Sequence, residues 1–426
     1  MKETFLFKML YYIIFVYGVL VLTPYTMIYC KMILAIVAVI WLVLIGLYMW
    51  KKNIKEMLVV SAVGFFFLWE IILKLLGHSS ALWAIYGTHF LFIITVFMSV
   101  YVKCWLTDKE KGNLSSALFV AVMVNLLHNI WLYNKYENLN NFMYTELFEL
   151  TFGKINAGGT GFGNVIICFG FISLIYFFQT EHLIKKGVML LLYILSALFV
   201  SVLLGRGTAT ILLLLGSMLF LWGFLCKRFD NSSVHIMYAS LISLGLLVAI
   251  FAVPFLNLLI PFINVSVSER LGLKLMNIRD FMAGTSNVLS PRSGDSLAGR
   301  INMMISDIKY FYSTPLTLVL GNGLHTYSAK TVYLTTAINK SSGHSDVFDM
   351  LARYGTIGII YMIVYFNYVR TLGTKIKGYK NIWMIFWFIY LGTGILSGCF
   401  GADISMMMLI VAPGMLHEIF GEVREI

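Results

Sequence analysis

The residues best suited to chemistry stand where the longest polar segment of the chain meets an apolar one. Gly343-His344-Ser345 is followed, after nine residues, by Gly355-Thr356-Ile357-Gly358. The imidazole of a free histidine has a pKa near ~6.5, so a histidine can act as a neutral base at physiological pH. A lone histidine is more often structural, and both roles are open for His344. Its place beside a glycine-containing apolar segment favours a reactive group at the mouth of a cavity. Asp346 is a candidate to orient or replace it.

Three arginines are candidates for binding an anion. Arg206 stands in Gly205-Arg206-Gly207 and is the only charge for a long way on either side. One interpretation is an arginine that snorkels to the membrane surface. The other is an anion-binding residue, because its planar guanidinium matches phosphate oxygens and the flanking glycines admit a bulky group. Arg292 and Arg300 lie in a polar stretch, where solvated surface arginines are common. Arg300 is the stronger of the two because it begins an amphipathic segment.

Other charged residues have simpler explanations. Asp349 and Arg353 are four apart and are expected to pair, as are Glu70 and Lys74. No Walker motif, HExxH motif or metal-ligand cluster occurs, which disfavours an ATP-driven pump and a zinc protease. We therefore expect neither a metal nor a cofactor.

The composition predicts the kind of fold that positions these residues. Of the 426 residues, 60% are hydrophobic and only 12% are charged, and the mean hydropathy is +0.85. A soluble domain carries about twice that charge, so the sequence predicts a single all-α domain, 1–426, that spans a membrane many times. The formal net charge of +11 is then explained by lysines on the cytoplasmic side, and a nucleic-acid partner is not expected. The cysteines are odd in number and are interpreted as small apolar residues.

Apolar segments of about 20 residues predict about twelve membrane helices. They lie near 9–29, 32–50, 57–76, 81–102, 114–133, 160–179, 187–204, 208–225, 235–260, 349–369, 382–397 and 402–420.

The lysines and arginines support this count independently. With the N-terminus inside, every inner segment is basic, for example at Lys51, Lys103 and Lys185, whereas the short outer turns are nearly free of basic residues. Both termini are therefore predicted to be cytoplasmic, and residues 261–348 become one large extracytoplasmic loop between the ninth and tenth helices.

The large loop is expected to contain some local structure. Residues 299–312 show helical periodicity, and Pro315 is expected to close that stretch. Gly321-Asn322-Gly323 predicts a turn.

These motifs resemble the signature of the O-antigen ligase and polymerase superfamily. The resemblance rests on Arg206 with Gly207, on Arg300, on Gly321-Asn322-Gly323, and on His344-Ser345 with Gly355-x-x-Gly358. It covers roughly residues 200–365, and the first six helices match only in hydropathy.

The resemblance implies a GT-C-like helical fold in a bacterial cytoplasmic (inner) membrane, with the active site on the periplasmic or exterior side. It implies a metal-independent glycosyltransferase that moves glycan from a polyprenyl diphosphate carrier to an acceptor hydroxyl. The arginines would stabilise the diphosphate leaving group, and His344 would be the base.

Within that superfamily, a polymerase of O-antigen, capsule or exopolysaccharide repeat units is the first hypothesis. Its partners would be the lipid-linked oligosaccharide donor and acceptor and membrane lipid, with a chain-length regulator protein as a further candidate. A ligase that moves polymer onto lipid A core is the alternative, and a flippase for the same lipid is the alternative of another class.

Overall fold

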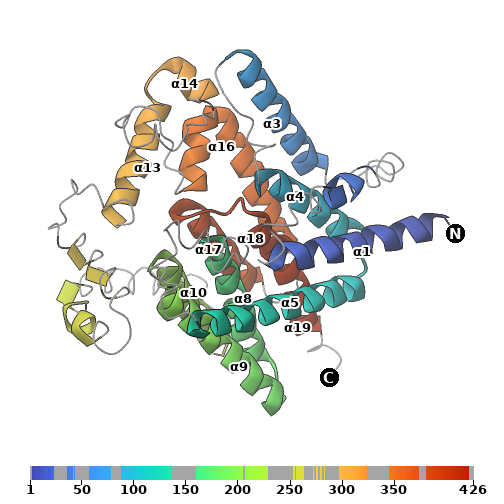
Figure 1. Ribbon diagram of the computed structural model, residues 1–426, viewed down its shortest axis with the longest axis vertical. Helices are drawn as coiled ribbons and strands as arrows, with labels where there is room; N and C mark the ends of the chain where they lie inside the picture. Colours follow the sequence, from blue (N-terminus) through green and yellow to red (C-terminus); the bar gives the residue numbers. More distant parts are fainter. Residues whose placement is uncertain are drawn as a thin grey trace.

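The computed structural model is a bundle of α-helices (Figure 1). It describes residues 2–23, 36–41, 43, 57–77, 88–135, 160–204, 207–228, 253, 254, 256–262, 272, 275, 276, 279, 280, 283, 297–321, 323, 345–373 and 380–421. No strand occurs in these ranges. The helices are α1 (Lys2–Leu22), α3 (Met57–Leu75), α4 (Thr88–Trp105), α5 (Asp108–Lys135), α8 (Thr160–Gln179), α9 (Leu183–Leu198) with the π-helical η2 (Phe199–Leu203), α10 (Gly207–Arg228), α13 (Leu297–Phe311), α14 (Pro315–Leu320), α16 (Asp346–Leu372), α17 (Lys380–Leu396), α18 (Ala402–Met406), the π-helical η4 (Met407–Val411) and α19 (Ala412–Gly421).

Five helical segments of the described chain are long and apolar enough to cross a membrane. They are Asp108–Leu132, Phe162–Gln179, Leu183–Leu203, Asp346–Leu372 and Ala402–Phe420. Shorter apolar helices cover Leu6–Leu22, Phe90–Trp105, Leu212–Leu221 and Ile382–Leu396. The helical, membrane-protein character predicted from composition agrees with this structure. The count of about twelve helices stays a prediction, because most of 32–50 and 235–260 lies outside the described residues.

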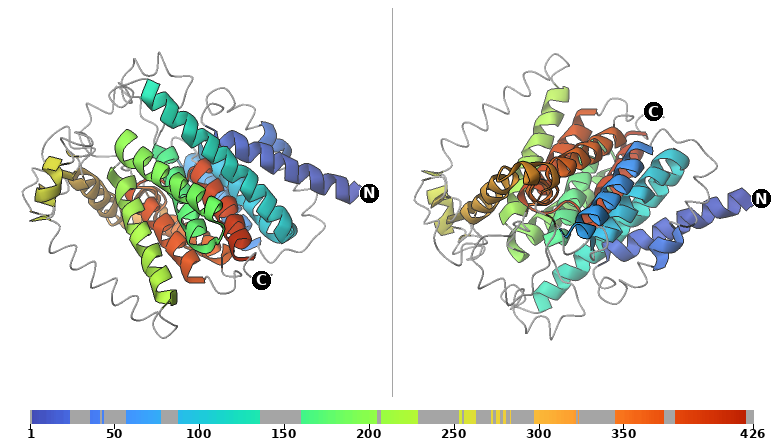
Figure 2. Two further views of the ribbon diagram at one scale, coloured as in Figure 1. Left: turned by 90° about the horizontal axis from the view of Figure 1, so that it is seen from below. Right: turned by 90° about the horizontal axis from the view of Figure 1, so that it is seen from above.

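The outer surface of the bundle is apolar as well as its core. Large hydrophobic side chains are exposed along α3, α9, α10 and α16, including Leu68, Leu191, Leu214 and Ile363. A water-soluble protein rarely exposes this much apolar surface, whereas lipid-facing helices do. Figure 2 shows the helices packed together from two opposite directions, with α1 extending away from them.

Several boundaries differ from the sequence prediction, among them those of α1, which covers Lys2–Leu22 instead of 9–29. Two of the differences have identifiable local reasons. Helix α5 begins at Asp108 rather than near residue 114 because Thr107 and Glu110 form a capping box, in which the Thr107 N–H donates to Glu110 Oε2 at 2.9 Å. Pro315 does not close the preceding helix, which ends at Phe311. It is the first residue of α14, capped by Thr314, because a proline at this position lacks only an N–H that would have no helical partner.

Hydrogen bonds and ion pairs join the helix ends in two groups. In the first, His417 Nε2 lies 3.3 Å from Asp108 Oδ2, and Lys103 Nζ donates to Thr371 Oγ1 at 3.2 Å. This group combines the ends of α4 and α16 with the start of α5 and helix α19.

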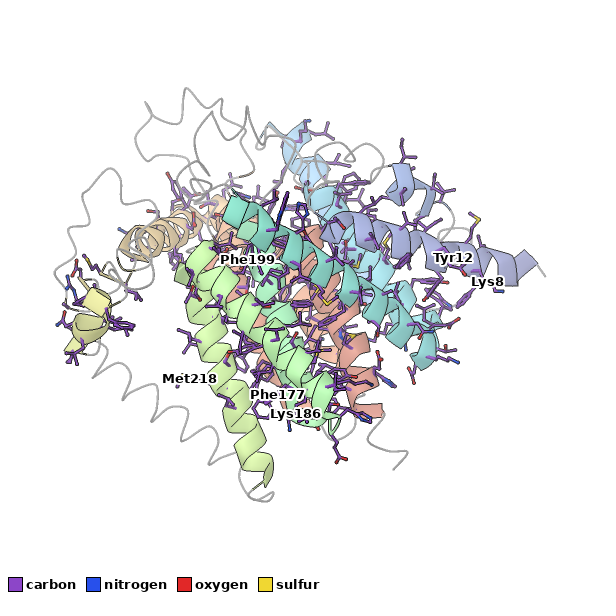
Figure 3. All side chains as sticks on the ribbon, turned by 60° about the horizontal axis from the view of Figure 1, so that its bottom comes forward. Lys8, Tyr12, Phe177, Lys186, Phe199 and Met218 are labelled. Carbon is purple, nitrogen blue, oxygen red and sulfur yellow. The ribbon has the colours of Figure 1, made fainter. Side chains whose placement is uncertain are left out.

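The second group combines the starts of α8 and α16 with residues 397–401, which connect α17 to α18. Segment α9–η2 runs between the two ends of the bundle, and Figure 3 shows its residues Lys186 and Phe199 far apart along it. Lys186 Nζ lies 5.3 Å from the centroid of the Phe177 ring, near the end of α8.

Candidate functional site

Helix α16 begins directly after the motif residues His344 and Ser345, and its first turn is fixed to α17. Ser345 is the N-cap residue, and its hydroxyl accepts the N–H of Phe348 at 3.3 Å. The same hydroxyl donates to the carbonyl of Gly394 at 3.2 Å, and Ser345 is buried. Because this hydroxyl both caps the helix and ties it to a neighbour, the start of α16 has a defined place in the bundle.

Asp346 binds the connection between α17 and α18. Its Oδ2 accepts the backbone N–H groups of Cys399 at 2.6 Å and Phe400 at 2.7 Å. Its own N–H donates to the carbonyl of Ser397 at 3.1 Å. A Cβ on Gly398 would lie only 3.3 Å from Oδ2, so the glycine lets the carboxylate approach the backbone closely. These bonds make Asp346 a clasp between two segments of the chain.

The sequence reasoning missed residues 397–401 as an element of this site. Tyr390 donates its hydroxyl to the carbonyl of Cys399 at 2.7 Å, and Asn164 Nδ2 donates to the carbonyl of Gly398 at 3.1 Å. The available signal was a glycine pair, Gly398 and Gly401, between two apolar helices, which permits close backbone approach.

The first turn of α8 links this connection to the residues beside Arg206. A Cβ on Gly163 would lie 3.7 Å from Leu204 Cδ1 and 4.0 Å from Ala209 Cβ, and these two residues flank the Arg206 turn. The next residue, Asn164, bonds to Gly398, which lies against the Asp346 carboxylate. The flanks of Arg206 and the start of α16 therefore belong to the same end of the bundle.

Helix α16 breaks at the first glycine of the motif. Gly355 has φ 57° and ψ −139°, a conformation that other residues rarely adopt. The carbonyl of Arg353, beside the break, accepts the N–H of Gly323 at 2.9 Å. Thr356 donates its hydroxyl to the carbonyl of Leu318 at 2.8 Å. Thus α14 and the turn that follows it dock onto the break in α16.

The two glycine motifs meet at this break without room for side chains. A Cβ on Gly321, whose φ is +72°, would overlap the carbonyl carbon and oxygen of Arg353. A Cβ on Gly355 would lie 2.7 Å from the backbone nitrogen of Gly321, and one on Gly358 would lie 2.5 Å from the carbonyl oxygen of Met350. The Gly-x-Gly turn and the Gly-x-x-Gly pair, which are apart in the sequence, form one junction, called here the glycine junction.

Helix α13 lies beside α14 and α16 (Figure 1). Arg300 is in its first turn, but the Arg300 side chain lies outside the described part of the structure, as do Arg206, Arg292 and His344. The convergence of these groups on one ligand stays a prediction, as does the orientation of His344 by Asp346. The glycine junction and the Asp346 clasp are the described features that would position them.

Two charged pairs are expected from the sequence to be structural. Arg353 Nη2 lies 3.3 Å from Asp349 Oδ2, which confirms the first pair. The second pair, Glu70 with Lys74, stays a prediction; Glu70 is buried and accepts the hydroxyl of Tyr354 at 2.7 Å, and Lys74 is exposed. In the described ranges, no group of three His, Cys, Asp or Glu side chains is placed to hold a metal ion.

No family model matches this chain, and no curated protein matches it significantly.

Proposed function

We propose that this chain is a membrane glycosyltransferase that polymerises polyprenyl-diphosphate-linked oligosaccharide repeat units of an O-antigen, capsule or exopolysaccharide. One observation carries the proposal. The flanks of Arg206 are joined to the start of α16, next to His344, through Gly163, Asn164 and Gly398 at one end of the bundle. A diphosphate-binding arginine and a histidine base must lie at the same end to act on one substrate.

The proposed reaction uses groups that these residues supply. The acceptor hydroxyl attacks the anomeric carbon of the donor glycan, and the bond from that carbon to the lipid diphosphate oxygen breaks. The hydroxyl proton passes to His344, the base of the proposal. Arg206 and Arg300, with Arg292 as a further candidate, stabilise the charge that grows on the leaving diphosphate, so the chemistry requires no metal.

Asp346 has a different role in this proposal from that of a base. Its Oδ2 already accepts two backbone N–H groups, from Cys399 and Phe400. Because this oxygen is already occupied by two donors, only Oδ1 of the carboxylate could accept a proton without breaking those bonds. We assign proton transfer to His344 and assign Asp346 to fixing the chain next to it.

The membrane orientation is part of the proposal. The lysine alternation assigns the end that contains Lys103 and His417 to the cytoplasm, and the end that contains Asp346 to the exterior of a bacterial inner membrane. The two groups of helix ends described above support this assignment, because the contacts join ends that the alternation puts on the same side. The donor and acceptor lipids would then reach the site from the outer leaflet.

The glycan of a deletion strain tests the function. Without a polymerase, single repeat units still cross the membrane and are attached to the acceptor, so the strain should show one-repeat glycan and no ladder. Complementation with the wild-type gene should restore the ladder, and complementation with Arg206→Ala should not. Full-length polymer that accumulates on the lipid carrier would instead identify a ligase, and single units trapped on the cytoplasmic lipid would identify a flippase.

A further inference from the structure

A cavity at the end of the bundle remote from Asp346 has no part in the proposed transfer reaction. Its volume is about 280 Å³, and it lies between the end of α4, the start of α5, the end of α16 and the η4–α19 segment. Its polar lining includes Lys103, Asp108, Lys111 and His417. Leu372 lines the cavity, and the helical stretch from Gly355 to Leu372 is about 25 Å long, so this cavity is separate from the glycine junction.

The charged groups of the cavity are held in place by contacts with one another and with α16. Asp108 lies between two basic groups, with Oδ1 3.2 Å from Lys111 Nζ and Oδ2 3.3 Å from His417 Nε2. Lys103 Nζ donates to Thr371 Oγ1 at 3.2 Å and lies 5.2 Å from the centroid of the Tyr368 ring. Two lysines and one aspartate line the cavity, so the lining is positively charged whether His417 is neutral or protonated.

The remaining walls are largely apolar. Val102, Leu372, Leu409, Ile410 and Pro413 line the cavity beside the charged groups. A phospholipid with its headgroup phosphate here would keep its acyl chains outside the cavity, against the apolar outer surface of the bundle, which a free anion cannot use. The volume lies just below the roughly 300–1,000 Å³ of typical small-molecule sites, which suits a headgroup rather than a whole lipid.

We propose that this cavity binds the phosphate of an anionic phospholipid, with Lys103 and Lys111 on the phosphate and the acyl chains outside the cavity, against the apolar surface of the bundle. An ammonium group has three N–H donors, and a phosphate diester offers several acceptor oxygens to two such groups. The ion pair with Asp108 holds the Lys111 ammonium group in place. No residue of the proposed transfer site lines this cavity, so lipid binding here does not depend on the proposed function.

Binding of short-chain lipids to the purified full chain tests this proposal. The probes are dioctanoyl phosphatidylglycerol, dioctanoyl phosphatidylcholine and inorganic phosphate, titrated in detergent by isothermal titration calorimetry. Phosphatidylglycerol should bind saturably and more tightly than phosphatidylcholine, whose ammonium group offsets the phosphate charge. A lysine near an anionic headgroup contributes about 1 kcal/mol, so Lys103→Gln and Lys111→Gln should each weaken phosphatidylglycerol binding about fivefold.

Lys109 supplies the matched control. It lies in the same turn of α5 as Lys111, but it is exposed and does not line the cavity. Lys109→Gln should therefore leave the affinity unchanged, and Lys111→Arg, which keeps the charge, should retain most of it. Lys111 is partly exposed, so its substitution keeps the test available if Lys103→Gln fails to fold, as judged by size-exclusion chromatography.

Three outcomes would overturn the proposal. The first is equal affinity for phosphatidylglycerol and phosphatidylcholine. The second is an equal effect of Lys109→Gln and Lys111→Gln, which would indicate general surface charge. The third is inorganic phosphate binding as tightly as the lipid, which would show that the acyl chains contribute nothing and would identify a soluble anion as the ligand.

Discussion

Replacing Gly321 by alanine should detach α14 from the break in α16. The residue has φ +72°, and an added Cβ would overlap both the carbonyl carbon and the carbonyl oxygen of Arg353. Because those atoms belong to the backbone, no side chain can move aside. The Gly321→Ala chain must lift α14 and the following turn away from α16.

The free-energy cost has two parts. Holding an alanine at this backbone conformation costs roughly 1–3 kcal/mol. Lifting α14 also breaks two hydrogen bonds, from Gly323 to Arg353 and from Thr356 to Leu318, worth roughly 0.5–1.5 kcal/mol each. The local opening free energy should therefore fall by about 2–6 kcal/mol, which corresponds to amide exchange at least about 30 times faster.

Hydrogen–deuterium exchange, followed by mass spectrometry, measures this local change. Peptides that cover residues 315–323 should lose protection in Gly321→Ala, up to the limit of full exposure. Peptides from α8 and α17 should not change, because neither helix packs on α14.

Substitutions of two other glycines serve as controls that distinguish the cost of backbone strain from the cost of a steric clash. Gly77 has φ +70°, but a Cβ there would meet no atom within 4 Å, so Gly77→Ala carries strain of about 1–2 kcal/mol and no collision. Gly187 lies in helix α9 with nothing within 4 Å, so Gly187→Ala should be neutral or stabilising by up to about 1 kcal/mol. If residues 315–323 exchange no faster in Gly321→Ala than in Gly77→Ala, the close contact of α14 with α16 is wrong.

Further perturbations test the proposed site and its orientation. Asp346→Ala should lower stability by about 3 kcal/mol or more, because two hydrogen bonds to a charged acceptor are lost, whereas Asp346→Asn should keep an acceptor and measurable polymer; complete inactivity of a well-folded Asp346→Asn would instead make Asp346 the base. Replacing His344 by alanine should reduce transfer in a purified assay by ~100- to 10,000-fold, and Arg206→Lys should retain little activity because lysine lacks the bidentate fork; normal rates in either would return that residue to a structural role. In a cysteine-free background, an impermeant thiol reagent should label Ser293→Cys but not Thr374→Cys in intact cells, and the opposite pattern would reverse the orientation.

Periodicity and composition alone predicted most of the described helices. The range 160–179 coincides with α8, and 57–76 and 402–420 differ from α3 and from α18–η4–α19 by about a residue at one end. These segments were predictable because apolar length is a local property of the sequence. The capping box at Thr107 is also a local sequence pattern. The prediction did not use it and therefore began α5 too late.

Tertiary structure alone decided which segments meet. The motifs drew attention to Gly321, Gly355 and Gly358, but only the fold shows that the turn at Gly321 docks onto the break at Gly355. Asp346 stood in the sequence as a possible partner of His344, and the fold shows its carboxylate bound to the backbone of 399–400. Partners that lie tens of residues apart leave no periodicity in the sequence, because the hydrogen bonds and close contacts that join them exist only after the helices have packed.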